Sequence, residues 1–229
     1  MTISDPDTNI IKNRCNELIG CKINIQFKMT FPNGDNQNGD INNRNIIGDC
    51  MENILLPFLQ GELHTIEKGP KQSSPDFYNR NKEWELKVFN GSPGFNISNL
   101  NSYIEQLADD TYRKLYRTQY LIFKYSIENQ YIIINDFKLC NVWDIILYTG
   151  KYPISLQCKK GMWYNIRPCS FNDMGVNKNP SLFIKNIIKA IKDCPNRINN
   201  KDTIIENIQT QFYKIQFEST LNSINSLNI

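Results

Sequence analysis

The chain has 229 residues, of which 40% are hydrophobic and 21% are charged, with a formal net charge of +3. This length allows one large domain or two small ones, and the composition excludes a disordered chain. Seven scattered cysteines without a CxxC pair argue against a structural zinc site, and no membrane-length apolar run or secretory leader is visible, so we expect a cytoplasmic, intracellular protein with reduced thiols.

The first part of the chain is predicted to contain a helix, a strand and a loop. A weakly amphipathic helix is expected over residues 8–19, and the alternating segment 22–27 is typical of a strand. Residues 32–45 are rich in Asn, Gly and Asp, which predicts a loop. Its acids and glycine do not fall at EF-hand offsets, so a calcium loop is rejected.

A helix is predicted next, because the apolar residues of segment 46–59 follow helical spacing, at Ile47, Met51, Ile54, Leu55 and Phe58. Glu52 lies beside this stripe with Asp49 one turn earlier, and both a solvated helix face and a place in a site remain open for Glu52. The only histidine, His64, follows in a segment without a GxSxG nucleophile elbow. Nucleases that use paired histidines are therefore excluded.

Residues 84–89 alternate between apolar and charged side chains, which predicts a strand with Glu85 and Lys87 on one face, about 6.8 Å apart. Asp76 follows a proline, where the chain is expected to be extended. Turn-forming residues at 79–82 favour an antiparallel pairing of the two segments. Such a hairpin brings the Asp76 and Glu85 carboxylates together beside Lys87. Two acids and a lysine at a sheet edge predict a site for a hard metal ion.

Pro75-Asp76, a spacer of eight residues and Glu85-Leu86-Lys87 resemble the signature of the PD-(D/E)xK nuclease superfamily, which includes most type II restriction endonucleases. The match covers residues 74–87. The resemblance implies an α/β fold, a restriction-endonuclease-like core in which helices flank a central mixed β-sheet. It also implies one or two Mg²⁺ ions per active site, held by Asp76 and Glu85. An acid on the preceding helix often joins this metal site, which suggests Glu52 as a ligand and catalytic residue, with Asp49 as a substitute.

The rest of the chain supplies further strands and helices. Strands are expected at 119–125 and 130–138, a β-hairpin at 152–158 and 162–167, and amphipathic helices at about 98–109, 181–194 and 202–220. The strands complete a sheet with segment 84–89. We expect a single nuclease domain over 1–229, with the catalytic core at about 46–138, a DNA-reading insertion at 139–180 and C-terminal helices at 181–229. Those helices complete the core or form a dimer surface.

Three groups of basic and polar residues are candidates for DNA contacts, one before Asp76, one at a helix end and one on the later hairpin. They are Lys68, Lys71 and Ser73; Arg113, Lys114 and Arg117; and Lys159, Lys160, Tyr164, Asn165 and Arg167. Each group has a plainer interpretation. In the same order, the plainer interpretations are a polar loop, a helix end whose cations complement the helix dipole, and a solubilising turn.

The function predicted is that of a Mg²⁺-dependent type II restriction endonuclease of a restriction-modification system, which cuts double-stranded DNA at a short specific site and leaves 5′-phosphate ends. Lys87 would orient or activate the attacking water. A homodimer is expected from the symmetry of palindromic sites, and no GxxxxGK[ST] loop is present, so ATP is not expected. The alternatives are a structure-directed repair or recombination nuclease, and a non-catalytic DNA-binding protein in which Glu85 and Lys87 form a surface ion pair.

Overall fold

The computed structural model describes residues 5–24, 26–30, 32, 34–40, 44–70, 74–148, 151–176 and 178–227. Lys71 and Ser73, two of the candidates for DNA contact, lie outside these residues. The chain divides into two compact units. Unit 1 consists of Met1–Pro93 and Gln119–Cys140, and unit 2 of Gly94–Thr118 and Asn141–Ile229.

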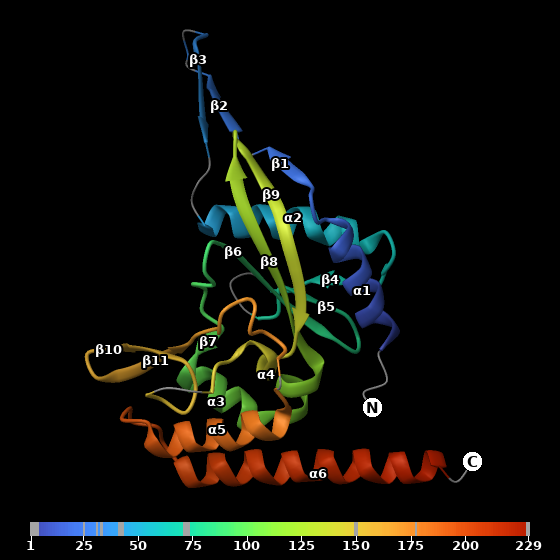
Figure 1. Cartoon of the computed structure of the whole chain (residues 1–229), viewed down its shortest axis with the longest axis vertical. Helices are drawn as coiled ribbons and strands as arrows, with labels where there is room; N and C mark the ends of the chain where they lie inside the picture. Colours follow the sequence, from blue (N-terminus) through green and yellow to red (C-terminus); the bar gives the residue numbers. More distant parts are fainter. Residues whose placement is uncertain are drawn as a thin grey trace. The chain divides into compact units, whose positions relative to one another are not determined.

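Unit 1 is an α/β unit built on a six-stranded sheet in the order β1-β9-β8-β6-β5-β4 (Figure 1). The strands are β1 (Lys22–Asn24), β4 (Glu67–Lys68), β5 (Phe77–Tyr78), β6 (Glu83–Asn90), β8 (Thr118–Glu128) and β9 (Tyr131–Cys140). Two helices accompany them, α1 (Pro6–Glu17) and α2 (Arg44–Gln60). The predicted mixed sheet flanked by helices is confirmed.

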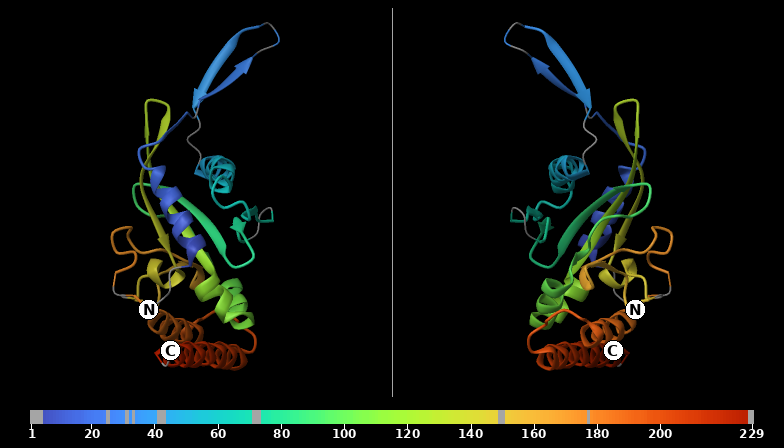
Figure 2. Two further views of the ribbon diagram at one scale, coloured as in Figure 1. Left: turned by 90° about the vertical axis from the view of Figure 1, so that its right-hand side faces the viewer. Right: turned by 90° about the vertical axis from the view of Figure 1, so that its left-hand side faces the viewer.

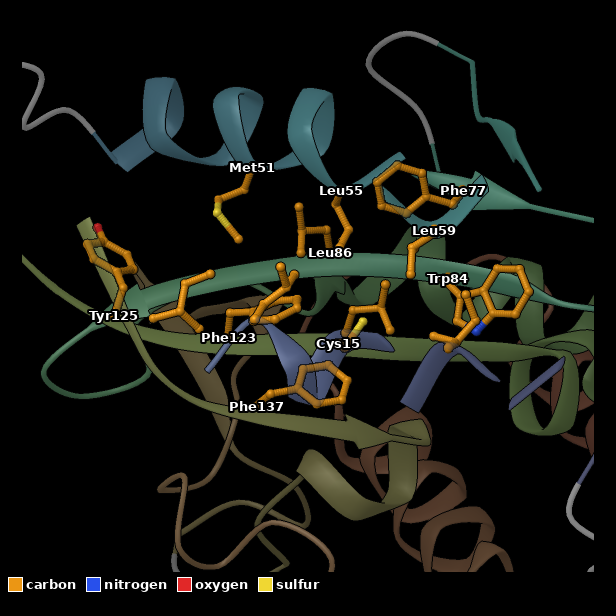
Figure 3. Close-up of a cluster of buried hydrophobic side chains, with 14 of the residues drawn as sticks. Cys15, Met51, Leu55, Leu59, Phe77, Trp84, Leu86, Phe123, Tyr125 and Phe137 are labelled. Carbon is orange, nitrogen blue, oxygen red and sulfur yellow. The ribbon is translucent and has the colours of Figure 1, made fainter. Parts of the chain in front are cut away.

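The core of unit 1 lies where both helices meet the sheet. α2 buries Ile47, Met51, Leu55 and Leu59, which recur every four residues and so form one stripe. Figure 3 shows Met51, Leu55 and Leu59 pointing toward the sheet, near Leu86 and Phe77. Each such side chain contributes about 1.5–3 kcal/mol when it is fully buried. Ile54, predicted to belong to the stripe, is 40% exposed instead, because each residue turns the helix by about 100° and Ile54 therefore lies to one side of the buried Leu55.

The prediction of a loop over residues 32–45 was wrong in part. β3 (Asn36–Asp40) pairs in antiparallel register with β2 (Gln26–Thr30), and α2 begins at Arg44. Figures 1 and 2 show this hairpin. Asn, Gln, Gly and Asp have low strand propensity, so their composition indicates a loop. The backbone of β2 nevertheless provides the partner for their hydrogen bonds.

In its described residues, unit 2 combines five helical segments with a small sheet in the order β10-β11-β7. Its strands are β7 (Ser98–Asn99), β10 (Leu156–Lys159) and β11 (Met162–Ile166). Its helices are α3 (Leu100–Asp109), the π-helix η1 (Arg113–Arg117), α4 (Val142–Ile145), α5 (Pro180–Asp193) and α6 (Lys201–Leu227). In the described part of the chain, no helix is long and apolar enough to cross a membrane.

α5 and α6 form an antiparallel pair of helices (Figure 1). Lys201 at the start of α6 donates to the carbonyl of Cys194 at the end of α5, and Gln216 donates to Ser181 near the start of α5. α6 also satisfies the end of α3, since Gln211 accepts from the Thr111 N–H at 2.9 Å and donates to the Ala108 carbonyl at 2.7 Å. The long C-terminal helix is thus tied to two others through polar contacts.

Candidate active site

A β-hairpin joins the two halves of the acidic motif. β5 and β6 are antiparallel, with Phe77 opposite Trp84 and Tyr78 opposite Glu83. Asn79 closes the turn, because its Oδ1 accepts from the Asn81 and Lys82 N–H groups at 2.9 and 2.8 Å. Continued by one position, this register sets Asp76 opposite Glu85. Directly opposite residues point to the same face of a sheet, so the turn brings the two carboxylates to one side.

Asp76, Glu85 and Lys87 are held by short polar contacts. The Oδ2 of Asp76 accepts a hydrogen bond of 2.6 Å from the Leu86 N–H. Lys87 Nζ lies 3.1 Å from Glu85 Oε2, so these two side chains form an ion pair along one face of β6. Glu85 is only 7% exposed. The structure thus groups the three residues of the motif.

The pKa of Asp76 shows that negative charge is concentrated at this site. Burial, followed by the nearby Glu85 carboxylate, raises the pKa of Asp76 to about 6. Lys87 and the Leu86 N–H act in the opposite direction, and Glu52 adds to the increase. The site would therefore gain stability from additional positive charge when Asp76 is ionised.

Glu52 reaches the same group from α2. Burial raises the pKa of Glu52, and Lys68 is the strongest influence that opposes this increase. Asp49, Lys87 and Glu85 also act on Glu52. Met51 and Leu55 are buried on α2, and Glu52 lies between them in the chain. In this position Glu52 is close enough to the hairpin for the charges of Glu85 and Lys87 to act on it.

The carboxylates of Asp76, Glu85 and Glu52 are suitable ligands for a divalent cation, but they do not yet form a complete binding site. Among the described residues, no three His, Cys, Asp or Glu side chains are gathered closely enough to hold one ion as they stand. Glu85 Oε1, however, is buried and has no hydrogen-bond partner among the residues that the structure describes. Carboxylate oxygens are the ligands that Mg²⁺ prefers, and a buried carboxylate oxygen without a donor favours a cation. Asp76 and Glu85, joined by Glu52, are the residues that would hold it.

Gly69 is a residue of this site that the sequence analysis did not identify. Its N–H donates to the Asp76 carbonyl at 2.8 Å, which extends the pairing of β4 with β5. A Cβ atom at Gly69 would lie 1.6 Å from the Pro75 carbonyl oxygen. The segment that carries Asp76 therefore requires glycine opposite it. From the sequence, the segment before Asp76 was interpreted only as a source of DNA contacts or as a polar loop.

Lys68 is the one candidate for DNA contact that the structure describes within unit 1. Its Nζ lies 3.8 Å from Glu52 Oε2 and donates to Asn53 Oδ1 at 3.1 Å. These contacts join the edge strand β4 to α2. Lys68 therefore belongs to the group of charged residues around the motif.

The remaining candidates lie in unit 2, in different environments. Lys114 of η1 is buried, and Arg167 donates to the Gly94 carbonyl and to Asn96 at 2.8 and 2.6 Å. Asn165 is also buried, and it donates to Gln157 at 2.8 Å. The side chains of Arg113 and Arg117 in η1 are half-buried. Arg167 and Asn165 thus have contacts within their own unit.

The β10–β11 hairpin exposes the other three candidates. Lys159, Lys160 and Tyr164 are exposed, and Lys159 Nζ lies 5.2 Å from the centroid of the Tyr164 ring. The register shifts between Gln157 and Cys158, so Tyr164 is the extra residue of a β-bulge. Bulges re-aim a side chain. The hairpin therefore presents two cations and an aromatic ring together.

Comparison with known proteins connects both units to one class of enzyme. The model of the NgoBV restriction endonuclease family matches residues 10–225. The type II restriction enzyme NlaIV of Neisseria lactamica is 31% identical over an alignment of 160 residues. The match covers 63% of this chain and 65% of that enzyme, slightly under two thirds of its length. The solved NlaIV restriction endonuclease has a TM-score of 0.74 with 23% identity, over 93% of this chain and 91% of that chain. At this identity the structural match establishes the fold.

Proposed function

Because the chain belongs to the NgoBV restriction endonuclease family, we propose that it is a type II restriction endonuclease that hydrolyses double-stranded DNA at a short specific site and leaves 5′-phosphate ends. The observation that carries the proposal is the grouping of Asp76, Glu85 and Lys87 around a buried carboxylate oxygen without a donor. We include both units in one nuclease domain, since the family model extends across them.

The proposed reaction depends on the positions of four charged side chains. Asp76 and Glu85 provide carboxylate oxygens on one face of the hairpin, and Glu52 adds a third from α2. These carboxylates would hold Mg²⁺, which would supply positive charge to lower the pKa of an attacking water and to offset the charge developing on the phosphate. Lys87, next to Glu85, orients that water and stabilises the anionic phosphate oxygens through its ammonium group.

DNA contacts are proposed for the tip of the β10–β11 hairpin. Lys159, Lys160 and Tyr164 are exposed there, and two cations beside an aromatic ring suit a nucleic-acid backbone or groove. The proposal for base reading is limited to this hairpin, because Tyr164 is exposed at its bulge. A β-ribbon is one of the elements that enters the major groove of DNA.

A homodimer is also part of the proposal. α6 buries Ile205, Ile208 and Phe212 on one side, whereas Tyr213, Phe217 and Leu221 are 63%, 70% and 47% exposed on another. These three recur every four residues and so form a second apolar stripe. A two-fold partner would cover this stripe and match the symmetry of a palindromic DNA site.

A reducing, cytoplasmic location is proposed because all seven cysteines are free thiols.

The test is cleavage of a mixture of plasmid DNA by the purified protein with Mg²⁺, followed by sequencing of the ends. We expect discrete fragments with a common terminal sequence and 5′-phosphates, and no cleavage in EDTA. Asp76→Ala and Lys87→Ala should each abolish cleavage while circular dichroism and DNA binding are retained. Absence of nicking with both Mg²⁺ and Mn²⁺ would overturn the proposal, and cleavage by either variant would remove that residue from the mechanism.

A further inference from the structure

Lys68 makes two contacts with neighbouring residues of one helix. It lies on β4, the edge strand of the sheet, and its Nζ is 3.1 Å from Asn53 Oδ1 and 3.8 Å from Glu52 Oε2. Its side chain is 43% exposed, whereas that of Glu52 is 26% exposed. Lys68 is thus the more exposed partner of this ion pair, and Glu52 the more buried one.

The two lysines of the site are divided between two of its acids. Lys87 is 3.1 Å from Glu85, and Lys68 is the nearest described cation to Glu52. Among the charges that act on Glu52, Lys68 lowers its pKa most, ahead of Lys87. Asp76 is held by the Leu86 N–H instead. In this arrangement Glu52 depends on Lys68 for its positive partner.

A divalent cation at the site and Lys68 are alternative partners for the same carboxylate. A carboxylate that binds a metal directs an oxygen lone pair at it and gives up part of its interaction with a neighbouring ammonium. Two cations near one carboxylate also repel each other. A metal ion that uses Glu52 therefore has to weaken the contact between Glu52 and Lys68.

We propose that Lys68 is a positioning residue that serves as an internal counterion of Glu52 and competes with a divalent cation for that carboxylate. The inference rests on the proposed metal-dependent function and adds to it a residue that sets metal affinity. Lys68 holds Glu52 close to the hairpin while the site lacks a metal. Removing its charge should therefore strengthen metal binding, whereas a purely structural tie between β4 and α2 would weaken it when lost.

The test measures metal binding directly, without DNA and without turnover, by titration calorimetry with Mn²⁺. Lys68→Met keeps the length of the side chain and removes its charge, and we expect it to bind Mn²⁺ between about twofold and fivefold more tightly than the unmodified protein. In a Glu52→Gln background the same substitution should change the affinity by much less, because the competition acts through Glu52. This double-mutant cycle isolates the coupling between the two residues.

Lys82→Met is a matched control, because Lys82 also lies in unit 1 and forms an ion pair of 3.9 Å, but with Asp5. It should leave the Mn²⁺ affinity unchanged. Equal or weaker binding by Lys68→Met, or an equal gain in the Glu52→Gln background, would overturn the inference while the nuclease proposal stands. If no variant binds Mn²⁺ and DNA is not cleaved, the proposed function falls and the inference falls with it.

Discussion

Asp76 Oδ2 accepts a hydrogen bond of 2.6 Å from the backbone N–H of Leu86, the residue between Glu85 and Lys87. The first acid of the motif is therefore anchored on the main chain of the triplet that carries the second acid and the lysine. Because a backbone donor does not depend on side-chain conformation, this contact keeps the two segments in register at the point where the proposed chemistry takes place.

Asp76→Asn should make the protein more stable near neutral pH. The folded pKa of about 6 lies above the ordinary value of 3.8, so the folded protein binds more protons than the unfolded chain between these values. Folding stability is therefore lost as the pH rises through that window. The amide oxygen of the substituted side chain still accepts from the Leu86 N–H, without the charge. We expect a gain of order 1–2 kcal/mol at neutral pH, shrinking toward zero below about pH 4, in thermal or urea denaturation. A less stable variant at neutral pH would contradict this.

The rate of DNA cleavage should fall as the pH decreases through about 6, because protonation of Asp76 removes an anionic oxygen from the site. Burial also raises the pKa of Glu52, which should steepen the decline. Initial rates measured at limiting Mg²⁺ would show the effect, and a higher Mg²⁺ concentration should shift the midpoint to lower pH because metal and protons compete. A rate that is independent of pH in this range would argue against ionised Asp76 as a requirement.

Gly69→Ala should impair cleavage although Gly69 carries no functional group. A Cβ atom would lie 1.6 Å from the Pro75 carbonyl oxygen, so the Pro75-Asp76 segment has to move. Misplacing a reacting group by about 1 Å can cost a factor of about 100 in rate, and we expect a loss of at least tenfold. Gly61→Ala is the control, because its Cβ would lie 3.4 Å from the nearest atom. Equal activity of the two variants would show that the hairpin absorbs the change.

Phe217→Glu should dissociate the proposed homodimer. Phe217 is 70% exposed in the middle of the apolar stripe with Tyr213 and Leu221, where a partner would bury it. A charge placed there would have to be desolvated in the dimer. Analytical ultracentrifugation should show a dimer for the unmodified protein and a monomer for the variant. Val176→Glu, at an exposed apolar residue of the same unit, should remain dimeric. A dimer that survives Phe217→Glu would exclude this stripe as the interface.

The Asp76–Lys87 hairpin was predictable from the sequence because every signal for it is local. Alternation sets the face of β6, and the turn formers around Asn79 set the register. The same holds for the helices, whose apolar spacing predicted α1, α2, α5 and α6 within a few residues at most boundaries. The strand Asn36–Asp40 was missed, because its pairing with β2 is made by the backbone of residues whose side chains favour loops.

What the sequence determined by itself was therefore a set of short-range relationships: which side chains share a strand face, which stripe a helix buries, and which acids lie one turn apart. Only the tertiary structure decided that Lys68 meets Glu52, and that the Pro75 carbonyl approaches Gly69 too closely for any side chain. The reason is physical. Contacts between an edge strand and a helix depend on how the whole core of unit 1 packs. The local pattern of residues predicts each element separately, so it does not predict the distance between Lys68 and Glu52.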